Sequence, residues 1–210
     1  MKLIVITPSV TVEHELSQIR EMFESGLPTL HVRKPKFSTS QLKAYLDDIP
    51  HQFHKNIVIH SHHELGSKYN LKGIHYTKSH LRNNFKNWWR EKRLKLSLQN
   101  FSKSCSHTKL ASLYEDHKFK FDYVFLSPIF DSLSGKFQSG FFEDGVRQAN
   151  LKSGQKIIAR GGVELKKIEQ IQELGFHGLA LYSCLWKKTN PLEEYLKIIQ
   201  KMNELKINIE

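Results

Sequence analysis

Residues 157–163 read IIARGGV: three apolar residues, an arginine, two glycines and a valine. The apolar run predicts a short buried strand, and apolar residues at helical spacing over 163–174 predict a helix after it. Two glycines between a strand and a helix let backbone N–H groups approach an anion closely. The stretch therefore predicts one strand–helix unit of a parallel sheet, with a candidate anion site in its turn.

The same alternation of strand and helix extends from this unit in both directions. We predict helices at residues 12–25, 62–69, 108–115, 163–174 and 190–205, a further helix opened by Ser38 and Gln41 at capping-box spacing, and a helical segment at 85–90. The predicted strands are residues 3–6, 29–32, 57–60, 73–76, either 94–98 or 101–106, then 123–126, 157–159 and 178–181.

Eight strand–helix units with short connections require a parallel sheet with right-handed crossovers. In 210 residues they fit a single-domain α/β fold, a (β/α)₈ TIM barrel over residues 1–210. The alternative is an open doubly wound sheet, but no Gly-x-Gly-x-x-Gly motif follows its first strand.

Composition narrows the class of partner. Lysine and arginine outnumber aspartate and glutamate by 32 to 21, so the net charge is +11, which suits nucleic acid, an anionic membrane surface or an anionic small ligand. No zinc-finger or RNA-binding aromatic motif accompanies the charge, so we expect a small phosphorylated substrate and neither nucleic acid nor a membrane. Two cysteines and the absence of a signal peptide or apolar membrane span predict a cytoplasmic protein.

Working residues of a TIM barrel follow the carboxyl ends of its strands, and phosphate sites commonly use the last two loops. We therefore predict a phosphate site at Gly161, Gly162 and Ser183. The long loop after the sixth strand adds Ser132, Ser134 and Lys136. The remaining polar candidates at predicted strand ends are His31, Arg33, His60, His75 and His107.

Several histidines could together bind a transition metal, but no ligand motif supports that geometry, so we expect no metal site. Cys105 would share a strand face with His107, yet a buried inert thiol is far more common than a nucleophile.

The chain resembles the thiamine phosphate synthase and TenI superfamily over nearly its whole length. The resemblance rests on the order and spacing of its motifs, which are LHVRK (30–34), GIH (73–75), SHT (106–108), DYVFLSPIF (122–130), ARGGV (159–163) and the Ser183 region. It implies a TIM barrel that works in thiamine biosynthesis.

Two activities occur in this superfamily. Synthases join a pyrimidine diphosphate to a thiazole phosphate and release pyrophosphate with Mg²⁺, whereas TenI-type members bind the thiazole phosphate and some isomerise a thiazole tautomer. The resemblance implies that Gly162 and Ser183 hold the thiazole phosphate and that Ser132, Ser134 and Lys136 lie where synthases hold pyrophosphate. Arg33 matches the arginine of the family's Gln-x-Arg-x-Lys motif, in which His31 replaces the glutamine. It also matches His107 to the acid–base histidine of the tautomerases.

The chain differs from the synthases at the positions of the metal ligands. Where synthases carry an Asn-Asp pair and a later Asp, this sequence has His60-Ser61 and His80. Mg²⁺ prefers carboxylate oxygens beside substrate phosphates, so both expected carboxylates are missing. We therefore expect a TenI-like thiazole tautomerase without a cofactor. A true synthase using Mg²⁺ and a non-catalytic binding or regulatory protein are the alternatives, and whether the chain forms a homodimer stays open.

Overall fold

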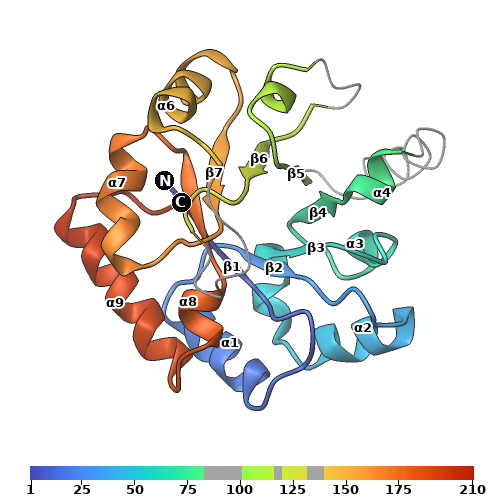
Figure 1. The fold of residues 1–210 in the computed structure, drawn as a ribbon. Coiled ribbons are helices and arrows are strands. Elements are labelled where there is room, and N and C mark those ends of the chain that lie inside the picture. Colours follow the sequence, from blue (N-terminus) through green and yellow to red (C-terminus); the bar gives the residue numbers. More distant parts are fainter. Residues whose placement is uncertain (83–100, 116–119, 132–139) are drawn as a thin grey trace.

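The computed structural model describes residues 1–82, 101–115, 120–131 and 140–210. Eight parallel strands form a closed barrel in which each strand pairs with the next along the chain and β8 pairs with β1 (Figure 1). The strands are β1 (Lys2–Ile6), β2 (Leu30–Val32), β3 (Ile57–Ile59), β4 (Gly73–Tyr76), β5 (Ser102–His107), β6 (Tyr123–Leu126), β7 (Ile157–Arg160) and β8 (Gly178–Leu181). The predicted TIM barrel is confirmed.

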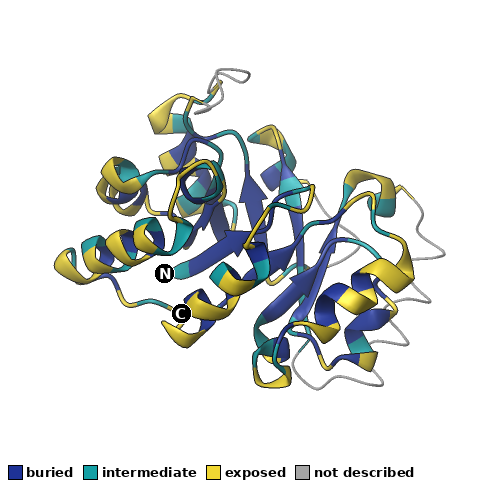
Figure 2. Ribbon diagram, turned by 90° about the horizontal axis from the view of Figure 1, so that it is seen from below, coloured by how far each residue is buried: buried dark blue, intermediate teal, exposed yellow. Residues whose placement is uncertain are grey.

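Helices surround the barrel, with exposed residues on their outer faces and buried residues toward the strands (Figure 2). They are α1 (Glu15–Glu24), α2 (Thr39–Asp47), α3 (Leu65–Lys68), α4 (Lys78–Leu81), α6 (Glu143–Lys152), α7 (Ile168–Glu173), α8 (Ser183–Trp186) and α9 (Pro191–Glu204), with 3-10 turns η1 (His51–Asn56), η2 (Ala111–Leu113) and η3 (Leu165–Lys167). No helix among these described segments is long and apolar enough to span a membrane.

Local sequence explains where two helices begin. The Ser38 hydroxyl accepts a hydrogen bond from the backbone N–H of Gln41, and the Gln41 side chain accepts one from the backbone N–H of Ser38, which completes the predicted capping box. The Asn190 side chain accepts from the backbone N–H of Glu193 at the start of α9, where Pro191 occupies the first turn.

Three sequence predictions need adjustment. The expected helix over 108–115 is only the short turn η2, and the helix expected over 163–174 is divided into η3 and α7. The fifth strand matches the candidate at 101–106, shifted by one residue, while the candidate at 94–98 and the helical segment at 85–90 lie outside the described residues.

Strand alternation divides the core into two layers. Apolar residues of four neighbouring strands face the barrel interior: Ile4, Ile6, Tyr123, Phe125, Ile158 and Ala180. The larger layer lies between the strands and the surrounding helices. The inner apolar residues come from β6, β7, β8 and β1, which leaves the other half of the interior to the side chains of β2 to β5.

A buried ion pair lies in the outer layer. Lys34, which follows β2, places its Nζ 2.7 Å from Oε2 of Glu15 on α1, and both side chains are at most 1% exposed. The Lys34 ammonium also donates to the Val10 carbonyl oxygen, and the Tyr45 hydroxyl donates to Oε1 of Glu15. These contacts fasten α1 and α2 to the end of β2 at the barrel mouth.

Candidate functional site at the barrel mouth

Three histidines predicted at strand ends line the polar half of the barrel interior. His31 of β2, His60 after β3 and His75 of β4 are all buried. Nδ1 of His31 lies 2.9 Å from Nε2 of His60, and the rings of His60 and His75 stack with centroids 4.2 Å apart. The structure therefore brings together three of the predicted binding residues.

Hydroxyl groups orient this cluster of His31, His60 and His75. The Tyr123 hydroxyl lies 2.6 Å from Nε2 of His31. On the β5 side, Ser104 Oγ lies 3.0 Å from Nδ1 of His75, and Ser106 Oγ lies 3.1 Å from its Nε2. Because each imidazole nitrogen of His31 and His75 has a partner, the rings are held in fixed positions.

Two arginines lie above the histidine cluster at the mouth of the barrel. Arg33 directly follows β2, and its positive charge acts on both His60 and Arg160. Arg160 ends β7 on the inner side with Ile158. The Arg160 guanidinium lies 5.8 Å from the centroid of the Phe125 ring and donates a long hydrogen bond of 3.5 Å to Ser106 Oγ. Both arginines are partly exposed, so a ligand entering from solvent can reach them.

Burial and positive charge keep the three histidines neutral. Burial lowers the pKa of His31, His60 and His75 well below its ordinary value, and the Arg160 charge lowers each of them further. Burial and the neighbouring Arg33 also lower the pKa of Arg160 to about 10. The mouth therefore combines cationic guanidinium groups with neutral imidazoles.

The His31, His60 and His75 cluster has the composition of a transition-metal site, although the sequence predicts none. One ring nitrogen from each residue can be chosen so that all three lie within 4.8 Å of one another, and this is the only such group found within the described ranges. Two nearby guanidinium groups oppose a divalent cation at this position. Neutral imidazoles suit Zn²⁺ far better than the oxygen-seeking Mg²⁺.

The residues expected at the synthase metal position do not fit Mg²⁺. Ser61 follows His60 and is partly exposed. The His80 ring accepts a hydrogen bond from the backbone N–H of Thr77 as part of the cap of α4, and it packs against His63. A hydroxyl and a capping imidazole offer none of the carboxylate oxygens that hold this ion in proteins.

His107 faces a different layer from the histidine cluster. It alternates with Ser106 on β5, and its Nε2 lies 3.4 Å from the Sγ atom of Cys105, a residue of the outer core layer. Burial raises the pKa of the Cys105 thiol to about 12, as expected for an inert thiol. His107 is 6% exposed, and its acid–base role stays a prediction.

The two glycines of the turn after β7 are held against the loop after β6. Gly161 and Gly162 have φ angles of +86° and +67°, which side chains rarely adopt. A Cβ atom on Gly162 would lie 2.4 Å from the Asp131 carbonyl oxygen, and one on Gly161 would lie 2.9 Å from Pro128 Cα. The glycine pair therefore has a packing role in addition to its predicted phosphate role.

We expect Gly162→Ala to destabilise the fold by about 1–3 kcal/mol, because the methyl group meets backbone and the φ angle is unfavourable. Urea unfolding followed by circular dichroism measures the loss. Gly154→Ala is the matched control, because Gly154 also has positive φ but has no atom within 4 Å of a Cβ. Equal losses in the two variants would contradict the contact with residues 130–131.

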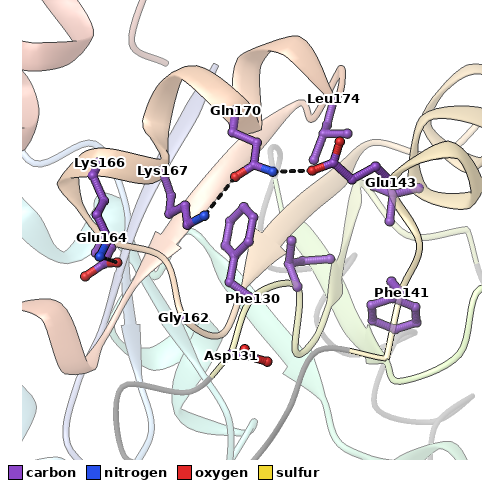
Figure 3. Close-up of a pocket in the computed structure, with 12 residues that line it drawn as sticks. Phe130, Asp131, Phe141, Glu143, Gly162, Glu164, Lys166, Lys167, Gln170 and Leu174 are labelled. Atoms are coloured by element: carbon purple, nitrogen blue, oxygen red, sulfur yellow. Dashed lines mark hydrogen bonds and ion pairs between the residues drawn. The ribbon is translucent and has the colours of Figure 1, made fainter.

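Two pockets flank the turn after β7. One, of about 480 Å³, lies between α6, α7 and the loop after β6 and includes Gly162, Phe130 and Lys167 (Figure 3). The Lys167 ammonium donates to Gln170 and lies 5.0 Å from the Phe130 ring centroid. The other, of about 390 Å³, includes Ser183 at the start of α8. Gly162 and Ser183 thus line different pockets, while Glu164 lines both.

Three predicted site residues fall outside the part of the chain that the structure describes, and two residues of the site were not predicted from the sequence. Ser132, Ser134 and Lys136 lie outside the described residues. Sequence reasoning did not single out Arg160 as a binding residue, or Ser106 as its partner. Strand alternation was the available signal, because Arg160 and Ser106 fall at inward positions of their strands.

Comparisons with known proteins agree with this fold. The family model described as thiamine monophosphate synthase matches residues 3–185. A thiamine phosphate pyrophosphorylase from Bacteroides thetaiotaomicron has 26% identity and a TM-score of 0.73, over 97% of this chain and 98% of the other. No curated protein sequence matches the chain.

More distant structures share the fold alone. A thiamine phosphate pyrophosphorylase from Pyrococcus furiosus has 15% identity and a TM-score of 0.77, over 97% of this chain and 96% of the other. A 3-hexulose-6-phosphate synthase has 13% identity and a TM-score of 0.69, over 96% and 99% of the two chains. The match to the family model covers most of the sequence, and the chain therefore belongs to the thiamine monophosphate synthase family.

Proposed function

We propose that this protein binds a thiazole phosphate at the barrel mouth and acts as a TenI-like thiazole tautomerase. The observation that carries the proposal is the set of side chains at the inner mouth, where Arg33 and Arg160 stand beside His60 and His75 with no carboxylate among the residues described there. Guanidinium groups suit a phosphate, and the neutral imidazoles beside them offer ring nitrogens that can hydrogen-bond a bound thiazole ring.

Tautomerisation needs fewer catalytic groups at this site than synthesis of thiamine phosphate does. Isomerisation takes one proton from the thiazole ring and returns one at another position, so it needs neither an oxidant nor a leaving group. Synthesis must stabilise a departing pyrophosphate, which Mg²⁺ supports in the synthases. Ser61 and His80 do not supply ligands for that ion, which favours the tautomerase.

Calorimetric titration of thiazole phosphate into the pure protein tests the binding step, and we expect a saturable one-site isotherm. Addition of the pyrimidine diphosphate with and without Mg²⁺ then tests for thiamine phosphate. We expect no product in either case. Product that depends on Mg²⁺ would make the protein a synthase, and an absence of thiazole phosphate binding would refute the proposed ligand.

Conversion of the thiazole tautomer tests the assignment of the base. The resemblance assigns the acid–base role to His107, which lies beside Cys105 rather than with the histidine cluster. On that assignment we expect His107→Ala to lower kcat by roughly 10²–10⁴-fold, the usual contribution of a general acid–base group. His75→Ala is the informative comparison, because His75 faces the interior below Arg160. Loss of turnover only in the His75 variant would transfer the role to His75. Tight binding by the wild type without any conversion would favour a non-catalytic binding protein.

A further inference from the structure

The two guanidinium groups at the mouth have no acidic partner. Arg33 and Arg160 take part in no ion pair within the described part of the chain, where the buried carboxylate of Glu15 is bound by Lys34. Arg33 is close enough to Arg160 to lower its pKa. Two partly buried like charges without a counter-ion are unfavourable in the free protein, and an anion between them would relieve that repulsion.

The surroundings of Arg160 hold its guanidinium ready for such an anion. The ring of Phe125 lies beneath it at 5.8 Å, and Ser106 Oγ accepts a hydrogen bond from Nη1. Ser106 is in turn fixed by His75. A guanidinium ordered by an aromatic ring and a hydroxyl loses little freedom when it binds a phosphate oxygen.

We propose that Arg160 binds the phosphate or diphosphate group of the ligand in place of a metal ion, so that anion binding at this mouth needs no divalent cation. This inference rests on the proposed function, because it concerns the same phosphorylated ligand. It assigns the positive charge that binds the phosphate to Arg160, whereas the sequence predicted the anion site at the glycine turn and in the loop after β6. It also explains why the carboxylates that would hold Mg²⁺ can be absent.

His31, His60 and His75 have the composition of a metal site, which leads to the opposite prediction, that anion binding depends on a metal ion. A divalent cation bound there would attract the phosphate itself and would make binding depend on metal. The arginine charges disfavour such an ion, and Tyr123, Ser104 and Ser106 already occupy nitrogens of the cluster. The metal dependence of anion binding therefore separates the two arrangements.

The experiment titrates inorganic pyrophosphate into the full-length protein by calorimetry, once in EDTA and once in Mg²⁺. We expect binding in EDTA that is no tighter in Mg²⁺. Arg160→Gln should weaken it by roughly 10–100-fold, the usual effect of losing a charge-assisted hydrogen bond. The pyrophosphate affinity of Arg160→Lys should lie between those of the wild type and Arg160→Gln, because lysine keeps the positive charge but lacks the planar pair of N–H donors. Arg20→Gln, on the exposed face of α1, is the matched control and should change nothing.

Circular dichroism of each variant confirms that it is folded, and a titration with thiazole phosphate separates this inference from the proposed function. Binding of pyrophosphate that requires Mg²⁺ or Zn²⁺, or full affinity in Arg160→Gln, would overturn the inference. Thiazole phosphate binding that is equally tight in the wild type and in Arg160→Gln would overturn the inference alone. A wild type that binds neither thiazole phosphate nor pyrophosphate would overturn the proposed function as well.

Discussion

Acidification from about pH 7.5 to about pH 5 is expected to lower the free energy of unfolding by as much as about 6 kcal/mol. The cause is the cluster of His31, His60 and His75, whose pKa values are lowered by burial and by Arg160. In the unfolded chain these histidines titrate near 6.5. The unfolded state therefore binds more protons below that pH, and acid favours unfolding.

The size of this effect follows from linkage. A histidine that stays neutral in the folded state and titrates normally in the unfolded state costs about 2 kcal/mol at about pH 5, and three of them cost about 6 kcal/mol. That loss is comparable to the whole stability of many domains. Stability is regained as the pH rises through the unfolded pKa, so it should be nearly constant above about pH 7.5.

Urea unfolding at several pH values measures this dependence. His60→Asn removes one titrating ring, so we expect the stability difference between the two pH values to shrink by about 2 kcal/mol, whatever the variant's stability at neutral pH. His51→Asn, at an exposed histidine of η1, is the matched control. If the free energy of unfolding changes as much between the two pH values in His60→Asn as in the wild type, His60 is not among the buried neutral histidines.

Replacement of Lys34 by methionine is expected to destabilise the protein by about 3–5 kcal/mol. The change leaves the Glu15 carboxylate buried at 1% exposure without its cation, and the penalty for an unpaired buried charge is large. Tyr45 still donates to Glu15, but one hydroxyl does not replace an ammonium group. Because Lys34 follows β2, the loss should also loosen the position of Arg33 and weaken anion binding at the mouth.

Denaturation in urea compares this variant with Lys197→Met, which breaks the exposed ion pairs of Lys197 with Glu193 and Glu194 on α9. The exposed pairs should contribute little to stability, because water and salt screen them. The double variant Lys34→Met with Glu15→Leu should recover much of the loss, because it buries no charge. A loss below about 1 kcal/mol in Lys34→Met alone would contradict the buried position of the pair.

Much of the fold was predictable from local pattern. The strands at 73–76, 123–126 and 178–181 have the predicted bounds, because short apolar runs between polar or glycine punctuation have few alternatives. The helix expected over 108–115 was wrong in extent, because periodicity over eight residues does not show where helical hydrogen bonds end.

The site was predictable in part. His31, His60 and His75 were identified by their place at strand ends, and they meet inside the barrel. Arg160 was not predicted as a binding residue, because the two glycines that follow it indicate an anion site made of backbone N–H groups. The phosphate role of Gly161, Gly162 and Ser183 stays a prediction. The structure adds that Gly162 and Ser183 line two separate pockets.

The sequence alone determined the order of strands and helices, the motifs of the family and the absence of the expected magnesium carboxylates. These properties follow from hydrophobic period and residue identity, which are local. Only the tertiary structure decided that His31, His60 and His75 form one cluster, that Lys34 is paired with Glu15 in the outer layer, and that Arg160 shares the mouth with Arg33. The reason is that closure of the barrel brings together side chains from strands far apart in sequence and settles which layer each one enters.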